Sequence, residues 1–283
     1  MIIDAHLHLW DLAAAEYPWL TPAIGPLYRS IGIAEIAPVL DDLGVDGVIL
    51  VQASDEPGDT TFLRQVMAAD ARVVGVVAWS PLDQPERLAR DLEGFAAGAG
   101  VVGIRNLIHE QPPAWLDRAE VERGLGVLAT AGLPWDVPTA DHEGLLPLSG
   151  IGARHPELRI VIDHLGKPPV GGSPEERSRW RRLLAECARN PLTVAKVSGL
   201  YAATGAMDSW TTASIRPFVE DALELFGPDR LIYGGDWPIS ELAGGYRRTW
   251  DALRTVLGGL GERDTDAIFG GTAARVYGLA PRG

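Results

Sequence analysis

The sequence has little cysteine, few basic residues and no long apolar run, and each of these features excludes some classes of protein. Cys187 is its only cysteine, so the chain can form neither an intrachain disulfide nor a cysteine-ligated zinc site. Lysine and arginine number 25 against 38 acidic residues, which gives a net charge of −13 without any basic block. Such a chain lacks the clustered basic residues with which proteins bind nucleic acids. No apolar run has the length of a membrane span, and the opening "MIIDAHLHLW" has no basic segment, so we expect a cytoplasmic protein that acts on a small molecule.

The sequence does contain enough apolar material for a large core, because 46% of its 283 residues are hydrophobic. Short β-rich runs alternate with helical patterns along the whole chain. Eight buried strands separated by helices, without a low-complexity linker, predict a single domain over residues 1–283, a (β/α)8 TIM barrel of class α/β. A doubly wound open sheet is the alternative, because periodicity does not show whether a sheet closes. The predicted strands are 2–8, 47–52, 73–79, 101–106, 133–137, 159–164, 193–198 and 230–236.

Helix start and stop signals support this alternation. Ser173 followed by Pro174 is typical of a helix start, and the predicted helix 216–226 ends at a Gly-Pro pair. Residues 11–31, which include "YPWLTPAIGP", precede the predicted helix 33–43 and are too many for a simple connection. Long loops of this kind usually line or cover a site, so we expect an active-site loop here.

The predicted carboxyl ends of the strands are unusually polar, and in a closed barrel the chemistry occurs at these ends. Each residue alone has a structural explanation: a His-x-His pair arises by chance, and an aspartate before Trp-Pro suits a turn. Their joint occurrence favours a site, because strand ends of a barrel share one cavity. Lys196 and Lys167, the only lysines, also fall in or just after such ends, whereas His109, His142 and His155 fall in loop or helix contexts. The strand-end set is His6, His8, Gln52, Trp79, Arg105, Asn106, Trp135, Asp136, Asp163, His164, Lys196, Ser198, Asp236 and Trp237.

An ordered set of segments carries a resemblance over almost the whole chain. "DAHLHLW", "GIRN", "DHLGKP", "AKVSGL", "LIYGGDWP" and "IFGGTAARVYGL" together resemble the amidohydrolase superfamily. More narrowly, they resemble its lactonase branch, which includes L-fuconolactonase, L-rhamnonolactonase and 2-pyrone-4,6-dicarboxylate lactonase. The resemblance implies a distorted TIM barrel in which His6, His8, His164 and Asp236 surround the reacting centre.

The resemblance also bears on cofactors. Binuclear members of the superfamily carry a bridging lysine on strand four and a histidine on strand five, where this chain has Asn106 and Asp136. It therefore implies zero or one divalent ion, zinc if one is bound, held by His6, His8, His164 and Asp236, and no organic cofactor.

Lactone hydrolysis needs a water nucleophile, a base and a group that stabilises the oxyanion. Our hypothesis assigns Asp236 as the base and later as the acid that returns the proton to the leaving alkoxide. His164 would bind the ion or, without an ion, the water or carbonyl directly. Arg105 and Lys196 would supply the positive charge that faces the oxyanion.

The substrate class follows from aromatic and polar side chains near the strand ends. Tryptophan faces suit the C–H faces of sugars, and amide or carboxylate groups can bond hydroxyls. Together with the resemblance, they favour a sugar-derived aldonolactone, although some tryptophans could instead plug the barrel. The predicted binding residues are Trp10, Gln52, Trp79, Asn106, Trp135, Asp136 and Trp237.

Three rival functions remain open at this point. A pyrone-dicarboxylate lactonase would need more cationic residues at the opening of the barrel to bind its dicarboxylate substrate. Arg29 and Arg247, in predicted loops, keep this function possible. A metal-dependent decarboxylase of the same superfamily would be inactivated by chelators and would release carbon dioxide. A sugar-binding barrel without catalysis would bind without turnover. Neither the lactone nor the oligomeric state follows from the sequence.

Overall fold

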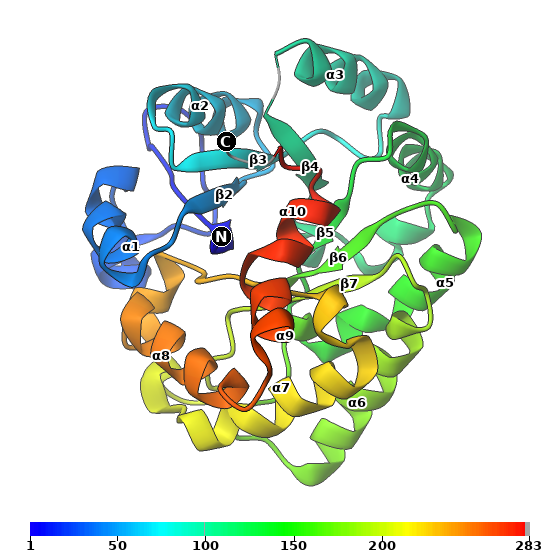
Figure 1. The fold of residues 1–283 in the computed structure, drawn as a ribbon. Coiled ribbons are helices and arrows are strands. Elements are labelled where there is room, and N and C mark those ends of the chain that lie inside the picture. The colour runs from blue at the N-terminus through cyan, green and yellow to red at the C-terminus, as the bar shows by residue number, and fades with distance from the viewer. Residues whose placement is uncertain (99, 281–283) are drawn as a thin grey trace.

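Eight parallel strands form one sheet in the order of the sequence, and the computed structural model describes residues 1–98 and 100–280 (Figure 1). Residues Leu7 and Trp237 form a parallel bridge between the first and last strands. Two backbone hydrogen bonds join the same ends, from His8 N to Trp237 O at 2.7 Å and from Asp236 N to His6 O at 2.8 Å. The sheet therefore closes into a barrel, as predicted, and the open doubly wound sheet is excluded. The strands are β1 Ile3–Leu7, β2 Gly47–Val51, β3 Val73–Ala78, β4 Val101–Arg105, β5 Trp135–Val137, β6 Ile160–Ile162, β7 Val194–Val197 and β8 Leu231–Tyr233.

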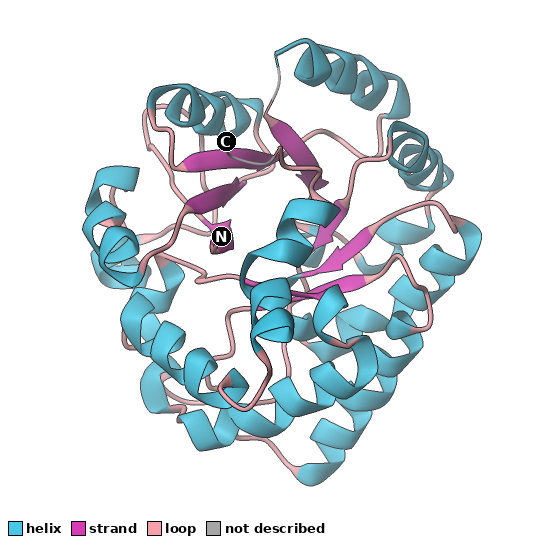
Figure 2. Cartoon of the chain, in the orientation of Figure 1, coloured by secondary structure: helices cyan, strands magenta, loops and turns pink. Residues whose placement is uncertain are grey.

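Helices surround the barrel (Figure 2). The predicted start at Ser173 is confirmed, because Ser173 Oγ accepts from Glu176 N at 3.2 Å and Ser173 N donates to Glu176 Oε2 at 2.7 Å. The predicted helix 33–43 divides into a 3-10 turn, Ile33–Glu35, and α1. The helices are α1 Ala37–Leu43, α2 Pro57–Ala69, α3 Pro85–Gly98, α4 Ala119–Ala131, α5 Leu146–Arg154, α6 Pro174–Ala188, α7 Thr212–Phe226, α8 Tyr246–Leu257, α9 Glu262–Asp266 and α10 Thr272–Val276.

The C-terminal segment crosses one end of the barrel, where Figure 1 shows α9 and α10 in red over its middle. Ala273, Val276 and Tyr277 pack against the apolar side chains of the barrel interior, such as Val161 and Ile232. The chain approaches the first strand so closely here that a Cβ on Gly270 would lie 2.1 Å from Met1 O. This packing fills the amino-terminal end of the barrel and leaves the carboxyl end for a site.

The loop over residues 11–31 folds back onto that carboxyl end. Trp10 and Ile31 form an antiparallel bridge at its base. Its aromatic side chains anchor it: Trp19 Nε1 donates to Ala53 O at 2.7 Å, and the Tyr17 hydroxyl donates to Asp59 Oδ1 at 2.8 Å. These bonds hold the loop beside the strand ends, where we expected an active-site loop.

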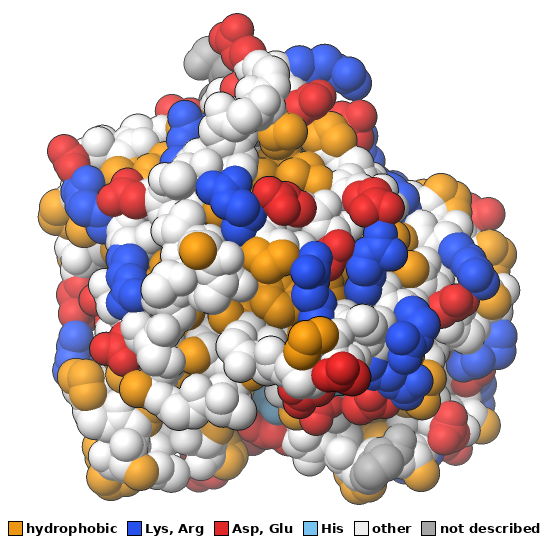
Figure 3. Space-filling view, turned by 90° about the horizontal axis from the view of Figure 1, so that it is seen from below, with side chains coloured by type: hydrophobic (Ala, Val, Ile, Leu, Met, Phe, Trp, Pro, Cys, Tyr) orange, Lys and Arg blue, Asp and Glu red, His pale blue; other side chains and the backbone are white. Residues whose placement is uncertain are grey.

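The surface agrees with the charge pattern of the sequence. On the face that Figure 3 shows, acidic and basic side chains are interspersed and do not gather into a basic patch. Among the described helices, none has the length and apolar character needed to cross a membrane.

Candidate active site

Three histidines and one aspartate converge at the carboxyl end of the barrel. His6 lies in β1 and His8 directly after it, His164 follows β6, and Asp236 follows β8. His164 and Asp236 both adopt a φ of 53°, in the left-handed region that costs a non-glycine residue on the order of 1 kcal/mol. These turns point both side chains into the barrel mouth. Gly199 is needed beside them, because a Cβ there would lie 2.4 Å from His164 Nδ1.

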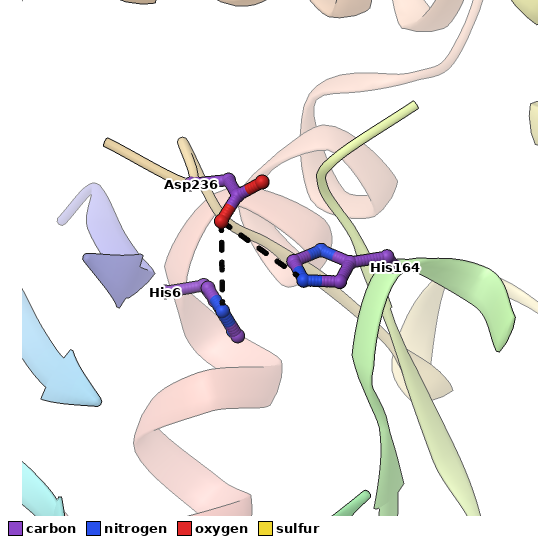
Figure 4. A group of neighbouring side chains, drawn as sticks. All are labelled: His6, His164 and Asp236. Atoms are coloured by element: carbon purple, nitrogen blue, oxygen red, sulfur yellow. Dashed lines mark ion pairs between the residues drawn. The ribbon is translucent and has the colours of Figure 1, made fainter. Parts of the chain in front are cut away.

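Three of the four side chains, His6, His164 and Asp236, are drawn in Figure 4, where both imidazole rings face the Asp236 carboxylate. Asp236 Oδ1 lies 3.8 Å from His6 Nε2, 3.7 Å from His8 Nε2 and 3.9 Å from His164 Nε2. Ligand atoms of His6, His164 and Asp236 all lie within 4.8 Å of one another, and His8 Nε2 is 3.0 Å from His6 Nε2. The four residues are buried.

Hydrogen bonds on the far side of the rings orient the imidazoles. His8 Nδ1 lies 2.8 Å from Val51 O, a carbonyl that can only accept, so His8 carries its proton on Nδ1 and its Nε2 lone pair faces the cluster. His164 Nδ1 lies 2.9 Å from Ser198 Oγ. His6 Nδ1 lies 3.3 Å from Asp163 Oδ1 and 3.1 Å from Lys196 Nζ. Lys196 Nζ can only donate, so His6 Nδ1 accepts from it and the His6 proton lies on Nε2, which faces His8 Nε2 at 3.0 Å; a cation bound there would replace this proton.

This donor set fits a divalent cation. Burial lowers the pKa of His6 to about 3 and holds the pKa values of His8 and His164 well below their usual range, so the rings are neutral. Neutral imidazole nitrogens 3.0 Å apart, beside a carboxylate, need a proton or a cation between them. Three imidazoles and a carboxylate are ligands that zinc accepts, and hydrogen bonds on the outer ring nitrogens are typical of its sites. His6, His8, His164 and Asp236 could therefore hold one ion.

The carboxyl group of Asp236 has a raised pKa. Burial raises its pKa to about 7, although Lys167, the Tyr201 hydroxyl and Arg105 favour the ionised form. A carboxyl group whose pKa lies near neutrality can accept a proton and return it within one turnover.

A buried network of charges lies behind His6. Lys196 Nζ lies 2.5 Å from Asp136 Oδ2 and 3.2 Å from Asp163 Oδ1, and Arg105 Nε donates to Asp163 Oδ2 at 2.8 Å. Burial opposes ionisation of Asp163, but the charges of Lys196, His6 and Arg105 hold its pKa well below the usual range. Lys196 is fully buried among these partners. Its placement does not support our expectation that it faces the oxyanion, because it contacts the back of His6.

A cavity of about 230 Å³ opens above the four donor side chains. Its lining contains four of the predicted site residues, His8, Arg105, His164 and Asp236, while His6 lies beside them in the cluster. The full lining is His8, Trp19, Ala53, Arg105, Leu107, His109, Glu110, Pro138, Thr139, His164, Lys167, Asp236 and Ile239.

Nine residues of the lining were left out of the predicted site, and Lys167, Trp19 and His109 are the ones that bear most on its chemistry. Lys167 is the lysine of the cavity, and its place directly after the "DHLG" segment was the available signal. Trp19 comes from the loop over 11–31, which we had expected to cover a site. His109, whose pKa is lowered to about 4 by burial, Arg105 and Lys167, gave no signal beyond its position after a strand.

The predicted tryptophans do not line this cavity. Trp10 is fully buried, and its Nε1 donates to Arg29 O at 2.6 Å, which anchors the loop. Trp135 alternates with the inward-facing Asp136 and therefore points outward into the core. The Arg87 guanidinium lies 5.5 Å from the ring centre of Trp79, and Trp237 packs in the core. These positions favour a structural role for the four side chains, the alternative that the sequence left open.

The predicted polar binding residues also have protein partners. Gln52 Nε2 donates to Arg105 O and to Asp55 Oδ1, both at 3.1 Å. Asn106 Nδ2 donates to Ser80 O at 2.9 Å. Asp136 accepts from Lys196 at 2.5 Å and from the Tyr277 hydroxyl at 2.7 Å. These three side chains support the strand ends and lie outside the cavity lining.

The closed parallel barrel, with histidines after β1 and β6 and an aspartate after β8, defines the chain as an amidohydrolase-type barrel. Residues 3–279 match the sequence profile of the amidohydrolases, and the chain belongs to this family.

Two named lactonases and one crystal structure are similar to this chain. An L-fucono-1,5-lactonase of Burkholderia multivorans is 31% identical over 98% of this chain and 96% of its own length. An L-rhamnono-gamma-lactonase of Scheffersomyces stipitis is 25% identical over 63% of this chain and 59% of its own. A crystal structure of a Burkholderia multivorans amidohydrolase with bound zinc superimposes with a TM-score of 0.91, at 31% identity, over 99% of this chain and 100% of that one.

Proposed function

We propose that this protein is a carboxylic ester hydrolase that opens the ring of a sugar-derived aldonolactone. One observation carries the proposal: three neutral imidazoles and a carboxyl group with a pKa of about 7 converge below a cavity that also contains cationic side chains. Full-length similarity to an L-fucono-1,5-lactonase supports this substrate class over others.

We propose that His6, His8, His164 and Asp236 hold one zinc ion. When bound, the ion would lower the pKa of a water molecule to about 7 and polarise the lactone carbonyl. The likeness to a zinc-bound amidohydrolase supports this choice of metal.

The chain's own residues would divide the reaction between them. Asp236 takes the proton of the attacking water at its carboxylate and later returns it to the ring oxygen that leaves as an alcohol. Arg105 and Lys167, which line the cavity, supply positive charge opposite the oxyanion of the tetrahedral intermediate. Lys167 takes the role that we first assigned to Lys196, while Lys196 keeps Asp163 ionised and donates to Nδ1 of His6.

The test is acid release, followed with a pH indicator, from a panel of L- and D-aldonolactones. We expect Asp236→Asn to lower kcat by about 10²–10⁴-fold, because it removes proton transfer in both directions. Glu110→Gln is the matched control, since Glu110 is a carboxylate of the same cavity outside the donor cluster. A wild-type protein that folds and binds zinc but opens no lactone in the panel would overturn the proposal, and carbon dioxide release from aromatic acids would then favour a decarboxylase.

A further inference from the structure

A second chamber adjoins the candidate active-site cavity. Its volume is also about 230 Å³, and three residues, His109, Pro138 and Thr139, line both spaces. We call it the side chamber. Its lining is Ile108, His109, Pro112, Trp115, Leu116, Pro138, Thr139, Ala140, Asp141, Glu143, Gly144 and Pro147.

The segments that follow β4 and β5 form the side chamber. After β4, the 3-10 turn Pro113–Asp117 contributes Trp115, whose side chain is 6% exposed. After β5, residues 138–141 lead into the 3-10 turn His142–Leu145. Both segments leave the carboxyl ends of their strands, as the lining of the first cavity does, so a ligand bound over Asp236 has a neighbouring space into which it can extend.

Thr139, which lines both spaces, carries an unpartnered hydroxyl. Thr139 is 3% exposed, and its Oγ1 has no hydrogen-bond partner among the described residues. Gly144 packs against this side chain, since a Cβ there would lie 2.7 Å from Thr139 Cβ, which fixes where the threonine sits. A buried hydroxyl without a partner is costly, and a ligand hydroxyl passing between the chambers would satisfy it.

The lining of the side chamber favours a neutral, hydroxyl-bearing ring. Trp115 and three prolines provide apolar walls, whereas no lysine or arginine is among its lining residues. Its two carboxylates disfavour an anion: Asp141, which accepts from Glu143 N at 2.9 Å, and Glu143, which pairs with Arg179 at 2.8 Å. Apolar faces combined with hydrogen-bond acceptors are the surroundings that a sugar ring prefers.

We propose that the side chamber is a binding subsite for a second sugar ring, so that the preferred substrate is an aldonolactone that carries a neutral glycosyl substituent. This inference rests on the proposed function for the first ring. Equal volumes of about 230 Å³ support it, because a space of the size available to the lactone ring is available to one more ring. Thr139 bonds a hydroxyl near the linkage, and Trp115 packs against the second ring.

The first experiment measures binding without turnover, by calorimetry. The probes are 1,5-anhydroalditols, which lack the lactone carbonyl, and the same compounds with a glycosyl group at each ring hydroxyl in turn. We expect one glycosylated probe to bind at least about tenfold more tightly than its parent. Ala140→Trp, which fills the side chamber from an exposed position, should abolish this difference, and Thr139→Val should reduce it. Ala119→Trp places the same bulk at an exposed site outside both chambers and should leave it unchanged.

The second experiment compares kcat/KM for mono- and disaccharide aldonolactones in the same variants. Ala140→Trp should lower kcat/KM by about tenfold or more for the disaccharide lactone only. Equal binding of every glycosylated probe and its parent would overturn the side-chamber proposal. Hydrolysis of monosaccharide lactones tests the proposed function separately, so failure of the side-chamber proposal is distinguishable from failure of the proposed function.

Discussion

Replacement of Lys196 by methionine is the sharpest test of the charge network behind His6. The lysine is fully buried, with Asp136 Oδ2 at 2.5 Å and Asp163 Oδ1 at 3.2 Å. Methionine has nearly the same length and no charge, so the substitution removes the ammonium while it preserves the packing. Among the described residues, Arg105 would then be the remaining cation in direct contact with either carboxylate, and it contacts Asp163 but not Asp136.

The expected magnitude follows from the cost of breaking a buried pair. Removal of one partner leaves an uncompensated charge and costs about 3–5 kcal/mol of unfolding free energy. For a chain of this size, that corresponds to a fall in Tm of roughly 5–8 °C. The cost should depend on pH. Burial raises the pKa of Asp136 to about 6 even beside Lys196, and loss of the ammonium raises it further. The folded variant then holds a proton that the unfolded chain releases, so its stability falls as pH rises from 5 to 8.

The assay is urea unfolding at pH 5 and pH 8, with a chelator present so that metal binding does not contribute. We expect a large deficit at pH 8 that shrinks at pH 5. The double variant Lys196→Met/Asp136→Asn should recover much of the loss, because the amide oxygen can still accept from Tyr277 and one carboxylate is gone. A single variant within 1 kcal/mol of wild type at pH 8, or a deficit that does not change with pH, would refute the argument.

Three further predictions follow from other contacts. His164→Ala should lower zinc affinity at least about tenfold, measured by metal content after dialysis, and unchanged content would exclude His164 as a ligand. Lys167→Met should lower kcat for lactone hydrolysis by about 10–10³-fold with little change in Tm, and unaltered kcat would remove it from the oxyanion site. Burial raises the pKa of Asp59 to about 6, so the ionised form destabilises the fold. Relative to Asp59→Asn, the wild-type unfolding free energy should therefore fall by up to about 3 kcal/mol as pH rises from 4 to 8 in urea titrations, and parallel pH profiles would contradict this.

Much of the fold could be predicted because its signals are local. Each strand is a short β-rich run, and helix α6 begins at a capping box that the sequence itself contains. The start of α7 was harder to predict. The helix begins at Thr212, four residues before the predicted start at residue 216, and Pro217 lies inside it. Pro217 is the sixth residue of the helix and cannot donate a hydrogen bond to the carbonyl of residue 213, yet the helix continues to Phe226.

The site was predictable only where the sequence fixes which way a side chain points. His6, Asp136 and Asp236 point inward, yet Trp135, one residue before Asp136, points outward by the alternation of a strand. Position at a strand end therefore did not distinguish a cavity residue from a core residue. Lys167 lines the cavity because the backbone turns at a φ of 54°, and no pattern of residue types revealed that turn.

The placement of the two lysines supports our proposal that this barrel mouth holds a single ion. The Lys196 ammonium already lies where Asp136 and Asp163 meet, so these carboxylates are compensated by a fixed charge of the chain. A second cation at that point would face the ammonium at short range, and repulsion between like charges in a buried site is strong. Asp236 is the one carboxylate of the His6 and His164 cluster that no protein cation contacts directly among the described residues. One divalent ion at that cluster therefore balances charge that the lysines leave uncompensated, while Lys167 remains available to the substrate.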